Sequence, residues 1–352
     1  MRETRKATLI LEDGTTFEGK IFGYEASTSG EVVFNTAMTG YPENLTAPSN
    51  EGQILITTYP ILGNYGAPPR GKKESLEELI QSGQIHAKAI ITQDYSCEYS
   101  HWQAASSLEQ WLLEEKIPGI YGIDTRALTK HLRENGTMLG KIVIEGDDNV
   151  EFYNPDGENL VGKVSHKEVE EYGAGEKTVV VVDCGTRYDI IKSMTNRGVK
   201  VVFVPWDYDF NTIPYDGLII SDGPGNPEQA EATLNNLRKA IETEKPIFGI
   251  GIGNLMLSIA AGGTINKLKS GHRTHNQPVR LCGTNSCYIT SQSHSYAVEA
   301  STLPADWEEW FINMNDGSNE GIRHKSKPFA AVQFSPDDSD TEFLLDEFVA
   351  KL

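Results

Sequence analysis

The segment from Thr178 to Gly185, TVVVVDCG, decides the fold of the second half of the chain. Its valines follow one another without a polar residue between them, which is typical of a strand buried on both faces of a parallel sheet. Beyond this segment, strand-like runs alternate with helical segments. The alternation predicts a doubly wound α/β domain with right-handed crossovers.

The other elements are predicted by working outward from this strand. In the second half we expect helices near 187–197, 227–242, 253–261 and 341–351, strands at 199–204, 217–221 and 246–250, and shorter strands after residue 261. In the first half we expect strands at 7–11, 16–21, 31–35, 53–58 and 87–92 and helices at 75–82, 108–115 and 125–135. Asp13-Gly14 predicts a hairpin between the first two strands, and Asp124 or Thr125 can cap the last helix.

The polar, acidic stretch 147–172 has little periodicity and predicts a linker with some local structure. We therefore expect an α/β chain with a first domain at 1–150, a linker at 151–177 and a second domain at 178–352. Two domains also fit the usual size of roughly 100–200 residues per domain.

The charge balance limits the possible partners. The chain has 31 Lys and Arg against 50 Asp and Glu, a formal net charge of −19. Such a surface repels phosphate backbones and anionic lipids, so we expect no nucleic-acid partner and no membrane partner. No apolar run approaches the roughly 18 residues of a membrane span, and we expect no signal peptide.

The cysteines stand far apart in the sequence, at Cys97, Cys184, Cys282 and Cys287. They form no CxxC pair, and no histidine pair with zinc spacing lies near them. This pattern suits free thiols in a reducing compartment, so the prediction is a cytoplasmic protein without a metal.

One segment, 66–73, nearly matches a phosphate-binding loop. Lys73 stands where such a loop needs Ser or Thr to hold magnesium, and Pro68 and Pro69 remove N–H donors. We therefore predict a surface turn at this position, and no ATP site.

Two glycine-rich turns follow strands of the second half. In SDGPGNP at 221–227, Gly223 and Gly225 allow a ligand to approach the backbone, and adjacent N–H groups can stabilise an anion. GIGIG at 249–253 has the strand–sharp turn–helix pattern of a nucleophile elbow. A working elbow carries Ser or Cys at its apex, whereas here the apex is Gly251. The alternative is a tight glycine turn without chemistry.

The order of these segments resembles the small, glutamine-amidotransferase subunit of carbamoyl-phosphate synthetase over essentially the whole chain. The N-terminal motifs that carry the resemblance are LEDG at 11–14, GEVVFNT at 30–36, MTGYPE at 38–43, TYP at 58–60, GNYG at 63–66 and GIDTRALT at 122–129. The C-terminal motifs are GPG at 223–225, GIGIG at 249–253, GHR at 271–273, NQPV at 276–279 and QFSP at 333–336. The resemblance implies a family-specific N-terminal α/β domain followed by a class I glutamine-amidotransferase domain.

The resemblance also implies a chemistry. The family hydrolyses glutamine with a Cys-His-Glu triad, in which a thiolate attacks the amide, histidine moves the proton and the acid orients histidine. By position, Gly251 corresponds to the cysteine, Ser335 to the histidine and Asp337 to the glutamate. Glycine has no nucleophile, and serine cannot do the proton transfer of histidine near pH 7. We therefore expect these catalytic positions to be inactive.

Further positions match the family's glutamine site: Ser49, Gly223, Gly225, Ile252, Leu255, Ser293, Ser295 and Tyr296. Gly223 and the Ile252 N–H correspond to the oxyanion hole. Leu255, Ser293 and Ser295 depart from the family's usual glutamine, asparagine and glycine. We expect glutamine binding to be weakened, because Leu255 removes a polar substrate contact.

Three separate losses indicate a site released from catalysis. We expect the small subunit of a carbamoyl-phosphate synthetase, in pyrimidine and arginine synthesis, that acts as a structural or allosteric partner of an ammonia-using large subunit. ATP, magnesium and bicarbonate are expected only on that large subunit, and no cofactor in this chain.

Two alternatives remain open. One is a non-enzymatic binding or regulatory protein without a synthetase partner. The other is an active amidase with relocated residues, such as Cys184 with His294.

Overall fold

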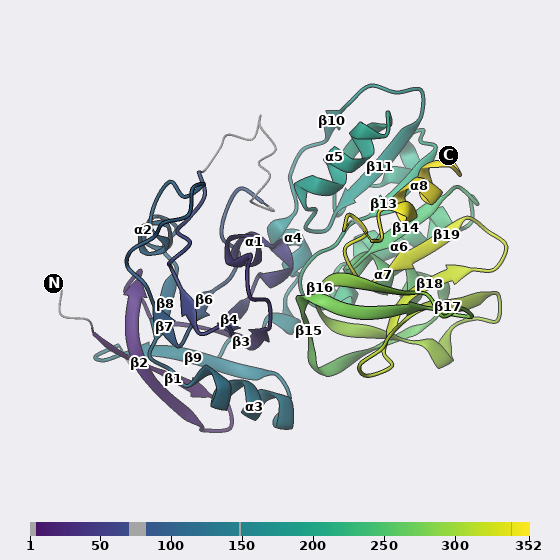
Figure 1. Ribbon diagram of the computed structural model, residues 1–352. Coiled ribbons are helices and arrows are strands. Elements are labelled where there is room, and N and C mark those ends of the chain that lie inside the picture. The colour runs from purple at the N-terminus through teal and green to yellow at the C-terminus, as the bar shows by residue number, and fades with distance from the viewer. Residues whose placement is uncertain (1–4, 70–81, 148, 339) are drawn as a thin grey trace. The chain divides into compact units, whose positions relative to one another are not determined.

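The computed structural model describes residues 5–69, 82–147, 149–338 and 340–352. The chain divides into two compact units, Met1–Asp156 and Gly157–Leu352 (Figure 1). The division falls inside the range 151–177, for which a linker is predicted. The predicted helix at 75–82 and the predicted turn at 66–73 lie partly outside the described residues, so neither is assessed.

The first unit is built on a closed β-barrel. The strands follow one another around it in the order β1 (Lys6–Leu11), β2 (Thr16–Gly23), β8 (Pro118–Tyr121), β6 (Ala89–Ile91), β4 (Gln53–Thr57), β3 (Thr28–Asn35) and β9 (Met138–Ile144). The predicted hairpin is confirmed, because β1 and β2 pair antiparallel and Gly14 takes φ +86° in their turn. Leu9, Val32, Ile54 and Ile142 belong to one buried core of this unit.

Shorter elements complete the first unit: α1 (Tyr41–Thr46), η1 (Pro48–Asn50), β5 (Ile61–Leu62), β7 (Asp94–Tyr95), α2 (Leu108–Glu114) and α3 (Thr125–Asn135). The predicted helices at 108–115 and 125–135 are confirmed by α2 and α3. The Asp124 carboxylate caps α3 by accepting a hydrogen bond from the Ala127 N–H at 2.9 Å. Leu128 and Leu132 of α3 contribute to the same core as the barrel strands.

The second unit contains one large sheet with helices on both faces. The strand order is β10 (Glu170–Tyr172), β12 (Lys200–Pro205), β11 (Thr178–Asp183), β13 (Gly217–Ile220), β14 (Ile247–Ile250), β19 (Phe329–Val332), β18 (Asn319–His324), β17 (Trp307–Asn313), β15 (Thr264–Leu281) and β16 (Cys287–Glu299). The strands from β12 to β19 in this order are all parallel. This arrangement confirms the predicted doubly wound domain.

The valines of β11 explain why the sheet is covered on both sides. Val180 and Val182 pack into one hydrophobic core with residues of α6 (Glu231–Ile241) and α7 (Ile252–Ala261). Val179 and Val181 pack into a second core with residues of α5 (Tyr188–Asn196) and α8 (Phe343–Val349). Successive side chains of a strand point to opposite faces, so an unbroken valine run requires an apolar layer on each face.

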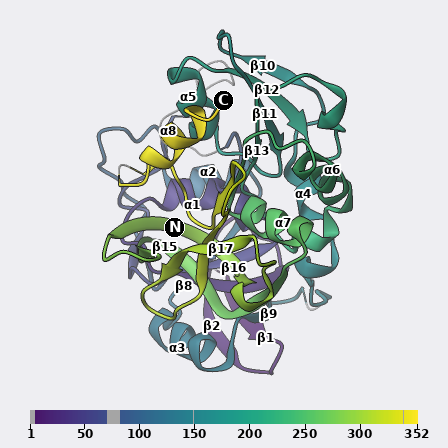
Figure 2. The same cartoon turned by 90° about the vertical axis from the view of Figure 1, so that its right-hand side faces the viewer.

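The helices of the second unit are α4 (Leu160–Val164), α5 (Tyr188–Asn196), α6 (Glu231–Ile241), α7 (Ile252–Ala261) and α8 (Phe343–Val349), with short 3₁₀ turns η3 (Phe210–Thr212), η4 (Pro227–Gln229) and η5 (Ala300–Thr302). The 3₁₀ turn η2 (Pro155–Gly157) spans the division between the two units. Figure 2 shows α6 and α7 along the same side of the sheet. The helix predicted at 227–242 is divided, because Ala230 (φ −95°, ψ 54°) interrupts the helical backbone between η4 and α6.

The prediction of only shorter strands after residue 261 is wrong. β15 runs for 18 residues and β16 for 13, and they form one long antiparallel ribbon. Two register shifts interrupt the pairing, between Lys267 and His272 and between Thr274 and Gln277. The ribbon places His272 directly opposite His294.

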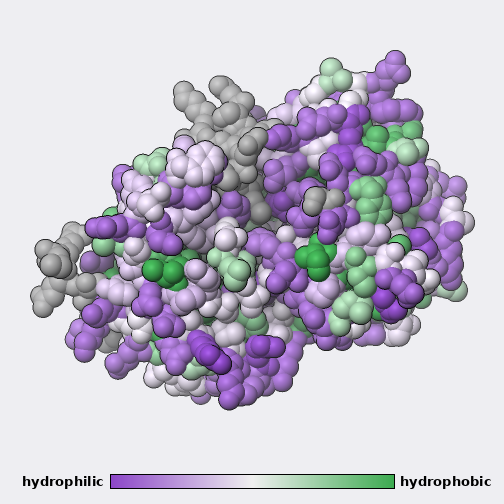
Figure 3. All heavy atoms as spheres, viewed as in Figure 1, coloured by the Kyte–Doolittle hydropathy of each residue, from purple (hydrophilic) through white to green (hydrophobic). Residues whose placement is uncertain are grey.

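The face shown in Figure 3 is mostly hydrophilic, and its apolar patches are small and separated. This is consistent with the net charge of −19. Among the described residues, no helix is both long enough and apolar enough to span a bilayer.

Candidate functional site

The turn between β14 and α7 places Gly251 at the apex of an elbow. Its backbone has φ +55° and ψ −113°, a conformation that L side chains rarely adopt. The flanking glycines are required by close packing. A Cβ on Gly249 would lie 2.5 Å from the Gly253 carbonyl oxygen, and a Cβ on Gly253 would lie 2.2 Å from that of Ile220. The geometry of a nucleophile elbow is present, and its apex carries no nucleophile.

A carboxylate lies where a side chain at the apex would begin. A Cβ built on Gly251 would be only 1.9 Å from Asp222 Oδ1 and 2.5 Å from Asp222 Cγ. The same oxygen accepts a hydrogen bond from the Ile252 N–H at 3.3 Å, and the Gly223 N–H also hydrogen-bonds this carboxyl group. The two N–H donors that were predicted to form an oxyanion hole are therefore engaged by Asp222.

The environment of Asp222 opposes its charge. Burial raises the pKa of this carboxyl to about 6, although the two backbone N–H donors and the Arg187 charge act in the opposite direction. The carboxyl is mainly ionised at pH 7, and a negative charge then stands at the elbow.

Arg187 joins the other two triad positions. It precedes α5, and its guanidinium donates from Nη1 to Ser335 Oγ and from Nη2 to Asp337 Oδ2, the latter at 2.5 Å. The Arg187 and Asp337 side chains are only 15% and 11% exposed. Burial alone would lower the pKa of Arg187, but Asp337 and Asp189 outweigh it, so the guanidinium stays charged. The side chains at two predicted triad positions, Ser335 and Asp337, thus both hydrogen-bond the guanidinium of Arg187.

The predicted substrate positions are placed as follows. Leu255 is 2% exposed and packs in the core shared by α7 and the sheet, against which Tyr296 also packs. Ser295 Oγ accepts a hydrogen bond from Arg273 Nη2. Ser293 lies on β16, paired with Arg273 of β15.

Gly225 and Ser49 are the remaining predicted substrate positions. Gly225 takes φ +79° in its turn, where a Cβ would lie 3.3 Å from Leu160. Ser49 is a buried residue of η1 in the first unit. The roles of Gly225 and Ser49 in binding glutamine stay predictions.

The alternative pair Cys184 and His294 is not arranged for catalysis. Cys184 is fully buried in the core beneath α7, and burial raises the pKa of its thiol well above the ordinary value. A thiol held neutral is a poor nucleophile. His294 instead makes hydrogen bonds with the Tyr296 carbonyl and Gln292 Oε1.

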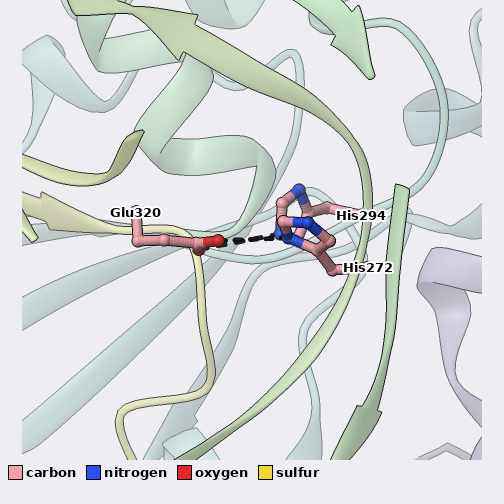
Figure 4. A group of neighbouring side chains, drawn as sticks. All are labelled: His272, His294 and Glu320. Carbon is pink, nitrogen blue, oxygen red and sulfur yellow. Dashed lines mark hydrogen bonds and ion pairs between the residues drawn. The ribbon is translucent and has the colours of Figure 1, made fainter. Parts of the chain in front are cut away.

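Three other side chains converge in the second unit: His272 from β15, His294 from β16 and Glu320 from β18 (Figure 4). One candidate ligand atom from each lies within 4.8 Å of the others, and all three residues are buried. Burial lowers the pKa of His272, but hydrogen bonds to Asp316 and Glu320 outweigh it and raise that pKa to about 9. This group could not be predicted from the sequence, because its members come from three separate strands and form no short motif.

Two family models match the chain. The model described as carbamoyl-phosphate synthase small chain, CPSase domain, matches residues 9–142, and that of class I glutamine amidotransferase matches residues 180–351.

Curated relatives match almost the whole chain. It is 47% identical to the mitochondrial carbamoyl-phosphate synthase [ammonia] of Homo sapiens over 98% of its own length, which is 24% of that protein. It is 49% identical to the multifunctional protein CAD of Squalus acanthias over 94% of its length, which is 15% of that protein. The chain thus spans a quarter or less of these relatives.

A solved glutamine amidotransferase from Thermotoga maritima is also similar, at 14% identity and a TM-score of 0.39, over 46% of this chain and 76% of that one.

Proposed function

Because the chain belongs to the carbamoyl-phosphate synthase small-chain family, we propose that it serves as the small chain of such a synthase but has lost its own glutaminase chemistry. Its partner is then a large synthetase chain or region, which holds ATP, magnesium and bicarbonate. The role left to this chain is structural or allosteric.

One observation carries the proposed loss: Asp222 Oδ1 lies 1.9 Å from where a Cβ of residue 251 would stand. Without a thiol, no covalent intermediate forms on the elbow. A tetrahedral intermediate also needs N–H donors for its oxyanion, and here a carboxylate occupies them and repels negative charge.

The second support is the contact of Ser335 with Arg187. A hydroxyl that accepts a hydrogen bond from a permanent cation does not accept a proton near pH 7. In an amidase with an intact scaffold, loss of the nucleophile and base together lowers the rate by roughly 10⁶-fold.

The relatives' names bear on the nitrogen source. The human relative is named for ammonia. Its name supports a small chain of this type that takes no part in glutamine hydrolysis. The use of the product in pyrimidine or arginine synthesis and the cytoplasmic location stay predictions, and the human relative is named as mitochondrial.

The test is reconstitution with the large synthetase chain, or with the corresponding region if both lie on one polypeptide. We expect a stable complex by sedimentation, and carbamoyl phosphate formed from ammonium but not from glutamine. Glutamine-dependent synthesis, or a glutamyl adduct found by mass spectrometry, would overturn the proposed loss. Absence of a complex would overturn the synthase role and favour a regulatory protein without this partner.

A further inference from the structure

Each of the imidazole rings of His272 and His294 is held in its orientation by a hydrogen bond at one ring nitrogen. His272 Nε2 lies 3.0 Å from Asp316 Oδ2, and His294 Nδ1 lies 2.8 Å from the Tyr296 carbonyl oxygen. His294 Nε2 lies 3.3 Å from Gln292 Oε1, so both nitrogens of this ring face oxygens that only accept hydrogen bonds. A metal-binding histidine usually donates its other N–H to a carboxylate or carbonyl in this way.

The two remaining ring nitrogens both face Glu320 (Figure 4). His272 Nδ1 lies 3.1 Å from Glu320 Oε1, and His294 Nε2 lies 3.7 Å from Glu320 Oε2. Asn313 Nδ2 donates to Oε1 at 2.9 Å and so holds the carboxylate in this orientation. The arrangement brings two imidazoles and one carboxylate to a common centre, each with a supporting contact.

One oxygen at this centre lacks a hydrogen bond. Glu320 is fully buried, and its Oε2 has no hydrogen-bond partner within the described part of the chain. His294 Nε2 faces this oxygen at 3.7 Å, beyond hydrogen-bond distance. A buried carboxylate oxygen without a hydrogen bond is costly unless a cation or a proton binds it.

We propose that His272, His294 and Glu320 bind one divalent transition-metal ion, for which Zn²⁺ is the best-fitting chemistry. Zinc takes His nitrogen and carboxylate oxygen at about 2.0–2.2 Å, so tetrahedral ligand atoms stand roughly 3.4 Å apart. His272 Nδ1 lies 3.1 Å from Glu320 Oε1 and His294 Nε2 lies 3.7 Å from Oε2, so each nitrogen is about this far from one oxygen of the carboxylate. Three protein ligands leave a fourth position for water or a small anion.

This proposal departs from the sequence-based expectation of a chain without metal. Histidines on two paired strands and a glutamate on a third form no recognisable spacing, so only the fold brings them together. The ion would link the β15–β16 ribbon to β18, which is separated from it in the sheet by β17.

The test is zinc titration of the chelator-treated full chain, by calorimetry and by competition with a chromophoric chelator. We expect one tight site per chain, and Glu320→Gln, which keeps the side-chain shape, to weaken binding at least roughly 100-fold. His131→Gln, at a histidine of the first unit outside the cluster, is the matched control and should leave the affinity unchanged. Equal affinity of Glu320→Gln and the wild-type chain, or no tight site in the wild type, would overturn the proposal.

Two further measurements cover other outcomes. If Glu320→Gln does not fold, Asp316→Asn serves instead, because it alters the group that orients His272 and leaves the three proposed ligands in place. We expect a roughly 10- to 100-fold loss of affinity, and an unchanged affinity would count against the site. Cobalt substitution separates this site from the exposed thiols of Cys97 and Cys287, because thiolate ligation adds an intense near-ultraviolet band. Such a band on the tight site would also overturn the assignment.

Discussion

At the apex of the elbow, one hydrogen atom and a neighbouring carboxylate occupy the space that a thiol needs. Gly251 keeps its unusual backbone angles, and Asp222 takes up the adjacent volume and its N–H donors. The change is confined to the apex, because Gly249 and Gly253 on either side of it still pack closely against neighbouring backbone. Catalytic chemistry can therefore be absent from a site whose backbone geometry is preserved.

A double-mutant cycle tests this fit. We expect Gly251→Cys to lower the free energy of unfolding by roughly 1–3 kcal/mol or more, because φ is +55° and the new Cβ meets Asp222. In an Asp222→Ala background the same substitution should cost clearly less, because Oδ1 and Cγ are gone. Urea unfolding of all four proteins measures the coupling. Additive effects would contradict the assigned contact, and neither Cys variant should release ammonia from glutamine.

The titration of Asp222 gives a second prediction at this scale. Its folded-state pKa of about 6 lies above the ordinary value of 3.8, so the folded state binds the proton more tightly. Stability from this group is present below pH 3.8 and is lost as the pH rises through 6. We expect Asp222→Asn to gain roughly 1–3 kcal/mol relative to the wild type between pH 4.5 and 7.5. A difference in unfolding free energy that is constant over this range would refute the raised pKa.

The sequence identified part of the site only. Gly251, Ser335 and Asp337 could be located because each stands inside an ordered motif. The place of Asp222 could not be predicted, since it depends on how one loop packs against another strand's end. Arg187 was missed for the same reason: nothing in its local sequence indicates contacts with residues far along the chain.

Among the elements, α7 buries in the core a residue that was predicted to match a substrate position. Leu255 stands one turn after the apex and is buried among the residues that join α7 to the sheet. A polar side chain here would have to leave that apolar layer or remain there without partners. The helix is thus fitted to packing at the position where the family has a polar contact.

Leu255→Gln tests this interpretation. We expect the free energy of unfolding to fall by about 2–4 kcal/mol, because an apolar contact is lost and an amide is buried. Leu113→Gln is the matched control, since Leu113 is a helical leucine that is 41% exposed. The control should change stability by less than about 0.5 kcal/mol. A mild effect at Leu255, equal to the control, would show that the helix tolerates the family's polar residue.

Strands were predicted correctly where a run of buried apolar residues marks them in the sequence. β11 lies within the predicted buried run, and β13 and β14 differ from the predicted strands by one residue at an end. β15 was not foreseen at its full length, because Lys267, Lys269 and Asn276 along it are polar and its pairing, rather than an apolar pattern, sustains it. Closure of the N-terminal barrel was missed because it depends on pairing between strands distant in sequence.

On the scale of the whole molecule, each unit has its own hydrophobic cores. Those of the first unit are formed by barrel residues and α2 and α3, and those of the second unit lie on the two faces of its sheet. A unit with its own core can fold as a domain. The boundary at Asp156 and Gly157 is therefore a physical division and not only a family boundary.

Expression of residues 157–352 alone tests that independence. We expect a cooperative thermal transition and a dispersed amide NMR spectrum, because both cores of the sheet are complete within this fragment. A fragment ending ten residues earlier at its C-terminus removes α8 and is the comparison, and should lose cooperativity. A non-cooperative transition of the complete fragment would show that its stability depends on the first unit.

The fit between Gly251 and Asp222 also has an evolutionary consequence. A lineage that regained only the thiol would meet a steric penalty, and one that vacated only the carboxylate would gain no reactive group. On the proposed loss of glutaminase chemistry, neither step restores amide cleavage alone. Such a loss would then be difficult to reverse by single substitutions.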